Sequence, residues 1–478
     1  MKKQGHIRTL ENIFQTGLQK FPSAILLADG NPVAENLAHP LDLNIFLQSY
    51  RANSKYLPMN EFEIYGWIDF DKDRLQIPHL LLITRLFDQD QLCLDLMVTS
   101  PLMTESYFSK ISFQKTPPMP LANQHTLDLD LLDKIQSTPG IPTDFYAQSK
   151  DLILRLQHHI QVFSKTRFFF EDLSSKNPVH QYRQDQITRW DQMMASFDHL
   201  VPFESTCQWV ADQSLTLQTH LNQNQLVVNI KPHRISIQED IFAACLSHTL
   251  SEIFKNRLPI HLVWKDRIHL ITKELQPIPV QLHPSTFFSF GVWLLSFLDQ
   301  HLHHFFQFER KAESAITPCF LQFHFQNSLI FTDALTGGLG AWKKNPGSWT
   351  PLPWKIPWQI PSLELQEALF PIRIASNELR TNIPSFGMYE GGPGCLRSYR
   401  VLQGCEIQWE LSYFDVRPKG SDGGQDGSLS ELWIQPTDEK SRYKVTSRSG
   451  TIHLPENSLV ILGTARGGAY GQLPTKSR

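Results

Sequence analysis

The sequence is poor in cysteine and in charge, and each shortage excludes a class of protein. Its six cysteines are scattered, with no C-x-x-C pair among them. The sequence therefore predicts neither a disulfide framework nor a cysteine-based zinc site, and it favours a reducing compartment. Charged residues make up 19% of the chain, and the formal net charge is −3. This balance gives no electrostatic reason to expect nucleic acid or anionic lipid as a partner.

Long apolar segments and targeting signals are also missing. The N-terminus, MKKQGHIRTLENIF, is basic but lacks the apolar stretch of a signal peptide. The most apolar run, residues 286–298, is too short to cross a bilayer before Asp299 interrupts it. No internal repeat or low-complexity tract is evident. We therefore expect a cytoplasmic protein.

Aromatic residues are abundant. The chain of 478 residues carries 31 phenylalanines and 11 tryptophans. On a weakly charged chain, such a content predicts burial in an extensive core or at a subunit interface. The length fits two or three cores, or one large interlocked unit.

Residue patterns predict both strands and helices. The Asp29-Gly30 turn lies between two apolar runs typical of a hairpin. Further apolar runs predict strands at residues 62–68, 80–87, 92–98 and 319–330. Helical spacing of apolar residues marks residues 143–163, 181–197, 241–254 and 285–308, and it places Trp190 and Met194 on one face of the second of these helices. Alternating apolar residues around Asn222-Gln223-Asn224 predict a second hairpin.

Glycine-rich loops organise the C-terminal part. Residues 384–394 crowd four glycines around Pro393, residues 418–427 carry four more, and residues 467–471 place three around Tyr470. Glycine is required where φ is positive or where another backbone or a ligand comes close. None of these loops contains the Gly-Lys-Ser/Thr of a P-loop. Turn geometry is therefore favoured over a phosphate cradle.

Together these loops resemble the C-terminal half of the hydantoinase B / 5-oxoprolinase family. Residues 389–394 match its Tyr-x-Gly-Gly-Pro/Leu-Gly loop, and residues 418–427 match its Pro-x-Gly-x-x-Gly-Gly-x-x-Gly spacing. Residues 454–471 match its closing Leu-Pro-Gly-Asp and Gly-Gly-x-Tyr-Gly segments with departures, since Arg466 stands where the family has glycine. Residues 336–341 are close to its Gly-Gly-Gly-Met-Gly-Ala turn. The resemblance covers nearly the whole chain.

The resemblance implies an α+β fold. The architecture would be β-rich, mixed and multi-layered, with helices packed on sheets. We expect three regions. Residues 1–200 would be β-rich with a helical extension, residues 201–375 a central α/β region, and residues 376–478 a β region that carries the glycine loops.

The resemblance also places the metal ligands of the family at positions that are substituted in this chain. Only Asp69 is left in place as a metal ligand, and proline and leucine cannot bind Zn, Mn or Fe. The substituted positions are Ala38, Asp42, Gln76, His79, Pro101, Leu102 and Thr104. A polar run of the family is apolar and aromatic here, at residues 353–361.

Several interpretations of the polar residues stay open. Asp69 is either a residual metal ligand or a carboxylate that caps a turn. Asp42 and His79 either form a rearranged site with Asp69 or mark the loss of the metal. His301 and His304 share a predicted helix face, but no carboxylate accompanies them, so a packed or solvated helix is favoured over a metal site.

By resemblance, the protein would be a subunit of an ATP-dependent cyclic-amide hydrolase of the 5-oxoprolinase or N-methylhydantoinase kind, or of a related carboxylase. A hydantoinase A-like subunit would bind ATP, and a divalent metal would complete the reaction in the family. No cofactor is expected in this chain. Two hypotheses follow: an active enzyme with a rearranged metal site, or a catalytically impaired subunit with a structural or regulatory role beside that partner or a catalytic paralogue. The substituted ligand positions favour the impaired subunit.

Overall fold

A computed structural model gives the fold of the chain. The residues that the structure describes are 23–27, 32–36, 64–71, 75–88, 91–101, 119–122, 132–133, 150–151, 153–154, 157, 178–235, 237, 239–254, 260–272, 284–326, 329–349, 362–437 and 441–472. Most of the helix predicted over residues 143–163 lies outside them, as do Ala38, Asp42 and residues 353–361. No helix in the described part of the chain is long and apolar enough to span a membrane.

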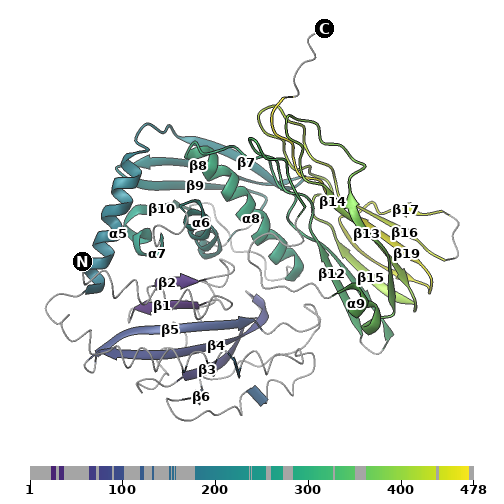
Figure 1. Ribbon diagram of the computed structural model, residues 1–478, viewed down its shortest axis with the longest axis horizontal. Coiled ribbons are helices and arrows are strands. Elements are labelled where there is room, and N and C mark those ends of the chain that lie inside the picture. Colours follow the sequence, from purple (N-terminus) through teal and green to yellow (C-terminus); the bar gives the residue numbers. More distant parts are fainter. Residues whose placement is uncertain are drawn as a thin grey trace, which may run out of the picture. The chain divides into compact units, whose positions relative to one another are not determined.

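The chain forms two compact units. The first comprises Met1–Asp198, Asn222–Leu226 and Leu250–His269. The second comprises His199–Leu221, Val227–Thr249 and Leu270–Arg478. Helices and antiparallel sheets occur together (Figure 1), which confirms the predicted α+β class. The three-region division of the chain stays a prediction.

The first unit contains an antiparallel sheet of six described strands in the order β2-β1-β5-β4-β3-β6. These strands are β1 (Ser23–Leu27), β2 (Pro32–Asn36), β3 (Ile64–Asp71), β4 (Leu75–Asp88), β5 (Gln91–Pro101) and β6 (Met119–Ala122). β1 and β2 pair on either side of Asp29-Gly30 in the sequence, which confirms the predicted hairpin. The strands predicted from the next three apolar runs are β3, β4 and β5.

Helix α5 (Pro178–Ala195) confirms the helix predicted from residues 181–197. Its Trp190 and Met194 are fully buried, on the apolar face that the spacing predicted. The indole N–H of Trp190 donates to the Asn224 carbonyl at 2.7 Å, so its polar atom is satisfied inside the core. Arg267, which ends α7 (Ile260–Arg267), holds both carboxylate oxygens of Asp191 at 2.6 and 2.7 Å.

The second sheet has the order β10-β9-β8-β7. Its strands are β7 (Phe203–Val210), β8 (Gln213–Asn222), β9 (Gln225–His233) and β10 (Ile268–Ile271). Helices α6 (Glu239–Ile253) and α8 (Pro284–Phe305) confirm the helices predicted there. Gln223 and Asn224 turn the β8–β9 hairpin with φ of 48° and 62°, in the left-handed region that polar turn residues tolerate.

The C-terminal part of the second unit is a sandwich of two antiparallel sheets (Figure 1), ordered β12-β11-β15-β18 and β13-β14-β19-β16-β17. The strands of the first are β11 (Cys319–His324), β12 (Ile330–Leu335), β15 (Cys405–Glu410) and β18 (Ser449–Leu454). Those of the second are β13 (Ile372–Arg380), β14 (Gly394–Val401), β16 (Glu431–Gln435), β17 (Tyr443–Lys444) and β19 (Leu459–Gly463). A short helix, α9 (Leu363–Leu369), precedes β13.

The prediction of one strand over residues 319–330 is wrong. β11 ends at His324 and β12 begins at Ile330, and the two pair antiparallel. The amide of Phe325 donates to the Leu329 carbonyl at 2.8 Å, which closes the turn between the strands. The sequence Gln326-Asn327-Ser328 supplies turn-forming residues, a signal that the apolar run on either side concealed.

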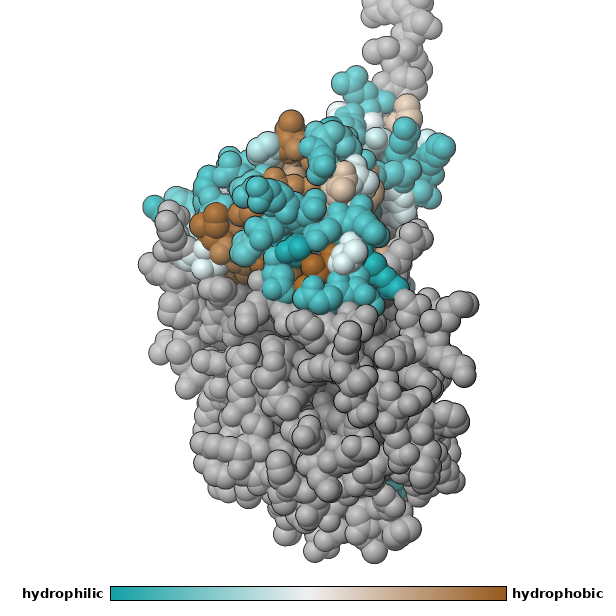
Figure 2. Space-filling view, turned by 90° about the vertical axis from the view of Figure 1, so that its left-hand side faces the viewer, coloured by the Kyte–Doolittle hydropathy of each residue, from teal (hydrophilic) through white to brown (hydrophobic). Residues whose placement is uncertain are grey.

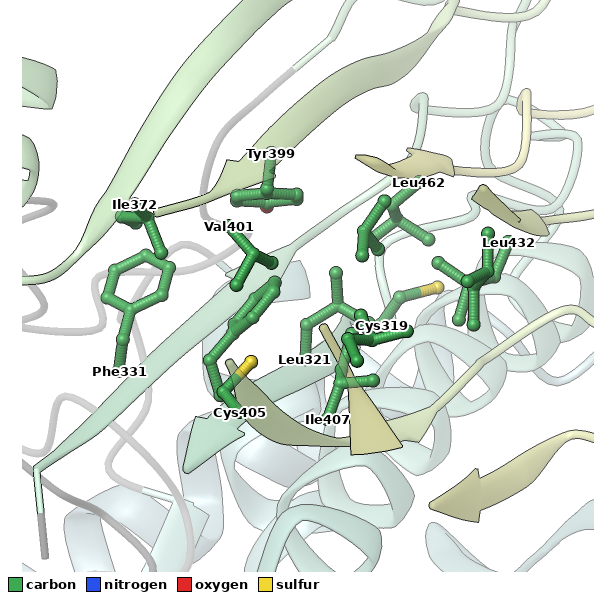
Figure 3. Packing of buried hydrophobic residues seen from close by; sticks show 14 of the residues in the cluster. Cys319, Leu321, Phe331, Ile372, Tyr399, Val401, Cys405, Ile407, Leu432 and Leu462 are labelled. Atoms are coloured by element: carbon green, nitrogen blue, oxygen red, sulfur yellow. The ribbon is translucent and has the colours of Figure 1, made fainter. Parts of the chain in front are cut away.

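Alternate side chains of both sandwich sheets fill one hydrophobic core, as a period of two requires. Figure 3 shows side chains from the two sheets pointing toward one another, among them Leu321, Phe331, Tyr399 and Leu462. The largest fully buried side chains of the described residues are Trp190, Trp293, Tyr399, Phe242, Phe306 and Phe323. On the face in Figure 2, described residues are mostly hydrophilic, with hydrophobic ones in separate groups. These large aromatic side chains of the described residues therefore lie in cores.

A charged pair lies buried in the sandwich. Asp333 Oδ2 accepts hydrogen bonds from the Arg397 guanidinium and the Tyr399 hydroxyl, both at 2.6 Å. Asp333 Oδ1 accepts the Ala334 amide at 2.9 Å. The side chains of Arg397 and Asp333 are only 4% and 8% exposed. The carboxylate is thus compensated by charge and by hydrogen bonds, which a buried ion needs.

Replacing Arg397 with alanine should lower the free energy of unfolding by about 3–5 kcal/mol, because Asp333 would stay buried without its counter-charge. Urea unfolding followed by tryptophan fluorescence measures the loss. Arg400→Ala is the control on the same strand, since Arg400 is exposed and its guanidinium donates to a backbone carbonyl, that of Asn457. Equal losses in the two variants would contradict a buried ion pair.

Candidate functional site

Four glycine-bearing segments of the second unit meet backbone to backbone. We call this the glycine-loop junction: residues 336–349, 384–394, 418–427 and 464–471. A Cβ atom at Gly392 would collide with the Ser348 carbonyl, and one at Gly391 would collide with the Gly467 carbonyl. Close approach of another backbone, one of the two reasons predicted for these glycines, is therefore confirmed.

The amides of the junction are used by its own carbonyls. Gly392 N–H donates to Leu339 O at 2.7 Å, and Gly467 N–H donates to Gly392 O at 3.1 Å. Gly468 N–H donates to Glu313 O at 2.9 Å. These three amides cannot also hold a phosphate. Packing geometry, rather than anion binding, thus accounts for these glycines.

Positive φ explains few of the glycines. Among the described residues, Gly423 and Gly471 are the glycines with left-handed backbone, at φ of 88° and 77°. The glycines of residues 384–394 have ordinary φ, so any residue could adopt their conformation. Only the lack of a side chain makes them necessary.

Arg466 stands where the resemblance expects glycine. Its side chain binds the neighbouring loop of residues 384–394 and the residue before it. Its guanidinium donates to the Gly391 carbonyl at 2.9 Å and to the Ile383 carbonyl at 2.5 Å. It also pairs with the Glu390 carboxylate at 2.7 Å. Five donors in a rigid fork suit this role, because one guanidinium can bind several oxygens at once. The sequence marks Arg466 only as a departure from the family pattern and does not reveal this role.

Replacing Gly392 or Gly424 with alanine should lower the free energy of unfolding by about 1–3 kcal/mol, because each new Cβ would overlap a carbonyl of a neighbouring loop. Thermal and urea unfolding measure the loss. Gly404→Ala is a matched control, since the nearest atom to its Cβ would lie at 3.5 Å. A loss as large at Gly404 as at Gly392 would show that backbone entropy, not close approach, explains the glycines.

A buried carboxyl, Glu313, lies against this junction. Its Oε2 accepts the Lys419 amide at 2.8 Å, and the Cys207 thiol lies 3.8 Å from its Oε1. Burial raises the pKa of Glu313 to about 7, above its ordinary 4.5. Glu313 also raises the pKa of Tyr413, whose burial is the larger cause. No local pattern in the sequence marks Glu313, because its partners come from distant segments.

The predicted metal positions lie in the first unit, on three neighbouring strands. Asp69 on β3 faces His79 on β4, and His79 faces Pro101 on β5. Asp69 lies in β3, two residues before the end of that strand. Gln76 lies near the start of β4. Asp42, Leu102 and Thr104 lie outside the described residues.

By residue type, the positions that the resemblance assigns to metal ligands offer few donors. The described residues contain no group of three or more His, Cys, Asp or Glu side chains that could hold a metal ion. Asp69 and His79 supply two donors in facing register positions, and Pro101 supplies none. Catalytic zinc usually has three protein ligands, so two are too few.

His301 confirms the packed-helix interpretation of the histidines on α8. Its Nδ1 lies 2.7 Å from Ser205 Oγ, and its Nε2 lies 2.8 Å from Thr219 Oγ1. Both ring nitrogens are thus occupied by hydroxyls. Burial, with a smaller contribution from His304, lowers the pKa of His301 to about 3. A neutral imidazole between two hydroxyls is a core residue, not a metal ligand.

His301 should make the protein sensitive to acid. Its folded pKa lies below its ordinary 6.5, so its contribution is fully present above pH 6.5 and is lost as the pH falls toward about 3. His301→Gln cannot take up that proton, so its melting temperature should fall less than that of the wild type between pH 7 and 5. His233→Gln is the exposed control. An unchanged pH dependence in His301→Gln would contradict this assignment.

Comparison with known proteins adds to this geometry. Residues 291–473 match the family model described as Hydantoinase B/oxoprolinase. All four segments of the glycine-loop junction lie within that match. The chain contains a hydantoinase B/oxoprolinase domain. The resemblance read from the glycine loops is thereby confirmed.

Two curated relatives of the hydantoinase B/oxoprolinase domain match short segments. The putative B-type subunit of a D-/L-hydantoinase from Pseudomonas sp. (strain NS671) is 30% identical over 105 residues, 22% of this chain and 18% of that protein. An uncharacterized protein from Methanocaldococcus jannaschii is 28% identical over 109 residues, 23% of this chain and 19% of that protein. The matched segment thus spans less than a fifth of the length of either relative.

Two solved structures share the fold over most of the chain. The ATP-dependent caprolactamase from Pseudomonas jessenii aligns with a TM-score of 0.63 and 12% identity, over 97% of this chain and 88% of that one. A nucleotide-free acetone carboxylase aligns with a TM-score of 0.68 and 10% identity, over 97% of this chain and 75% of that one. The likeness extends the hydantoinase-type fold beyond residues 291–473.

Proposed function

We propose that the chain is a hydantoinase B-like subunit of an ATP-dependent enzyme that hydrolyses cyclic amides of the 5-oxoproline or hydantoin type, or of a related carboxylase. We further propose that it is catalytically impaired and acts as a structural or regulatory subunit. One contrast carries the proposal: the glycine-loop junction is intact, whereas the described metal positions offer only two donors, Asp69 and His79. In this proposal the chain keeps the glycine-loop junction of the family but not its metal ligands.

The same relatives support the proposal of a partner subunit. One of them is named a subunit, and both structural neighbours are named for ATP-dependent or nucleotide-related enzymes. We expect a hydantoinase A-like subunit to bind ATP, or a catalytic paralogue of this chain to supply the active site. No cofactor is assigned to this chain. The five described free cysteines fit a cytoplasmic location, which stays part of the proposal.

A second candidate function rests on the register of the first sheet. Asp69 and His79 occupy facing positions on β3 and β4. With Asp42 as a third donor, these residues would make a rearranged site of the kind that divalent metals accept. The chain would then be an active metal-dependent amidohydrolase subunit. Metal bound there would polarise the amide carbonyl or lower the pKa of water.

The purified chain should hold no stoichiometric Zn, Mn or Fe after dialysis against a chelator, because Gln76, Pro101 and Leu102 stand at ligand positions of the family. Inductively coupled plasma mass spectrometry measures the metal content of the chain, alone and with any subunit that co-purifies. One equivalent of tightly bound metal would overturn the impaired-subunit proposal and favour the rearranged site.

Activity separates the two candidates. The assay is ATP-dependent hydrolysis of 5-oxoproline and hydantoins by the chain with its co-purified partner. If the chain is structural, Asp69→Ala and His79→Ala should leave turnover within about twofold of the wild type. Loss of turnover in both variants, with partner binding retained, would establish the rearranged site. Asp71→Ala, at the end of the same strand, is the control.

A further inference from the structure

Glu313 lies where three parts of the second unit meet: the connection between α8 and β11, strand β7, and the loop of residues 418–427. Its backbone is fixed by Glu313 N–H to Lys419 O at 2.8 Å and by Gly468 N–H to Glu313 O at 2.9 Å. Its side-chain Oε2 accepts a hydrogen bond from the Lys419 amide at 2.8 Å. Its Oε1 lies 3.8 Å from the Cys207 thiol, which can donate to it. Glu313 is 6% exposed.

The charges around Glu313 do not neutralise it. Lys419 Nζ pairs with Asp426 at 2.9 Å, and Glu313 forms no ion pair with any residue that the structure describes. The Tyr413 hydroxyl donates to the Ser314 carbonyl at 2.8 Å. The titratable groups that face Glu313 are therefore Cys207 from β7 and, from the segment after β15, Tyr413, Lys419 and Asp426.

An ionised carboxylate in this position has too few donors. Its two oxygens can accept about four hydrogen bonds. Here they receive one amide and one weak thiol contact, and Asp426 adds a repelling charge nearby. Both donors favour the charged form, but burial with so few partners outweighs them, so the charged form is costly. The long contact to the thiol is the weaker of the two.

We propose that Glu313 is a proton-operated clamp between β7 and the 418–427 loop: the protonated carboxyl keeps together the cluster of Glu313, Cys207 and the Lys419 amide, and ionisation loosens the cluster because it buries a charge with only two donors. The strength of the attachment between β7 and the 418–427 loop of the glycine-loop junction would then depend on pH. It is independent of the proposed metal chemistry, which concerns residues of the first unit.

The direction of the effect follows from linkage. The pKa of Glu313 is about 7 in the closed cluster against an ordinary value of 4.5, chiefly because of burial. Between pH 4.5 and about 7, Glu313 keeps its proton when the cluster is closed and releases it when the cluster opens. The stabilisation by the clamp is fully present below pH 4.5, is lost as the pH rises to about 7, and changes no further above that. Acidification therefore tightens the clamp.

Hydrogen exchange of the full chain tests the clamp. The probes are the amides of residues 203–210 and 413–420, at pH 5.5 and 7.5, with each rate corrected for the intrinsic effect of pH. In the wild type the protection factor should fall by roughly 10- to 30-fold between these pH values, since linkage gives up to about tenfold per pH unit inside the window. In Glu313→Gln, which keeps an acceptor for the Lys419 amide, it should stay constant.

The controls separate the clamp from other titrations. Glu378→Gln, an exposed residue on β13, should behave as the wild type. Acid weakens the contribution of His301 to stability and strengthens that of Glu313. The melting temperature of the whole chain therefore does not report on the clamp, and exchange at the local amides is compared instead. Constant protection in the wild type, or an equal fall in Glu313→Gln, would overturn the proposal.

A second variant keeps the test decisive if Glu313→Gln fails to fold. Asp426→Asn removes a charge that adds to the raised pKa of Glu313, whose main cause is burial, and can keep the hydrogen bond from Gly420 N–H, 3.0 Å long. The pH range over which protection falls should then move to lower pH. An unmoved range in Asp426→Asn would overturn the clamp as well.

Discussion

The structure of the C-terminal part depends on one steric constraint: backbones approach one another too closely for side chains. At the glycine-loop junction, the carbonyls of Ser348 and Gly467 occupy the space where Gly392 and Gly391 would carry a Cβ. The amides freed by that approach bond across the loops instead of to solvent. Charged side chains such as Arg466 and Glu313 form hydrogen bonds to backbone atoms of this junction.

The sequence predicted the elements whose signals are local. Glycine spacing marked the junction, helical spacing placed Trp190 on the buried face of α5, and Asn222-Gln223-Asn224 marked the β8–β9 turn. It could not reveal Glu313, whose side-chain partners Cys207 and Lys419 each lie 106 residues away. For the same reason Arg466 was recognised as a departure from the motif but not as a residue that binds the neighbouring loop. Both strands of the β11–β12 hairpin are apolar, so their turn was overlooked.

Scaffold and chemistry are separable in this chain because different forces specify them. Strand pairing in the first unit is made by backbone atoms, so Asp69 and His79 stay in register whatever metal they do or do not bind. Pro101 is tolerated because it is the last residue of β5, where a missing amide costs little. Substitution at metal positions therefore leaves the sheet intact, whereas a side chain at the junction would displace a backbone. Residues at the metal positions of the resemblance can therefore change while the fold is kept.

The strand order of the sandwich has a consequence for how the protein is made. β19 lies between β14 and β16, and β18 pairs with β15, so strands synthesised late complete sheets begun much earlier. Until residues 459–463 emerge from the ribosome, β14 and β16 each present an open edge, and the last glycines of the junction are still missing. Open edges pair readily with other chains. Nascent chains stalled before this point would therefore be the form most in need of a chaperone.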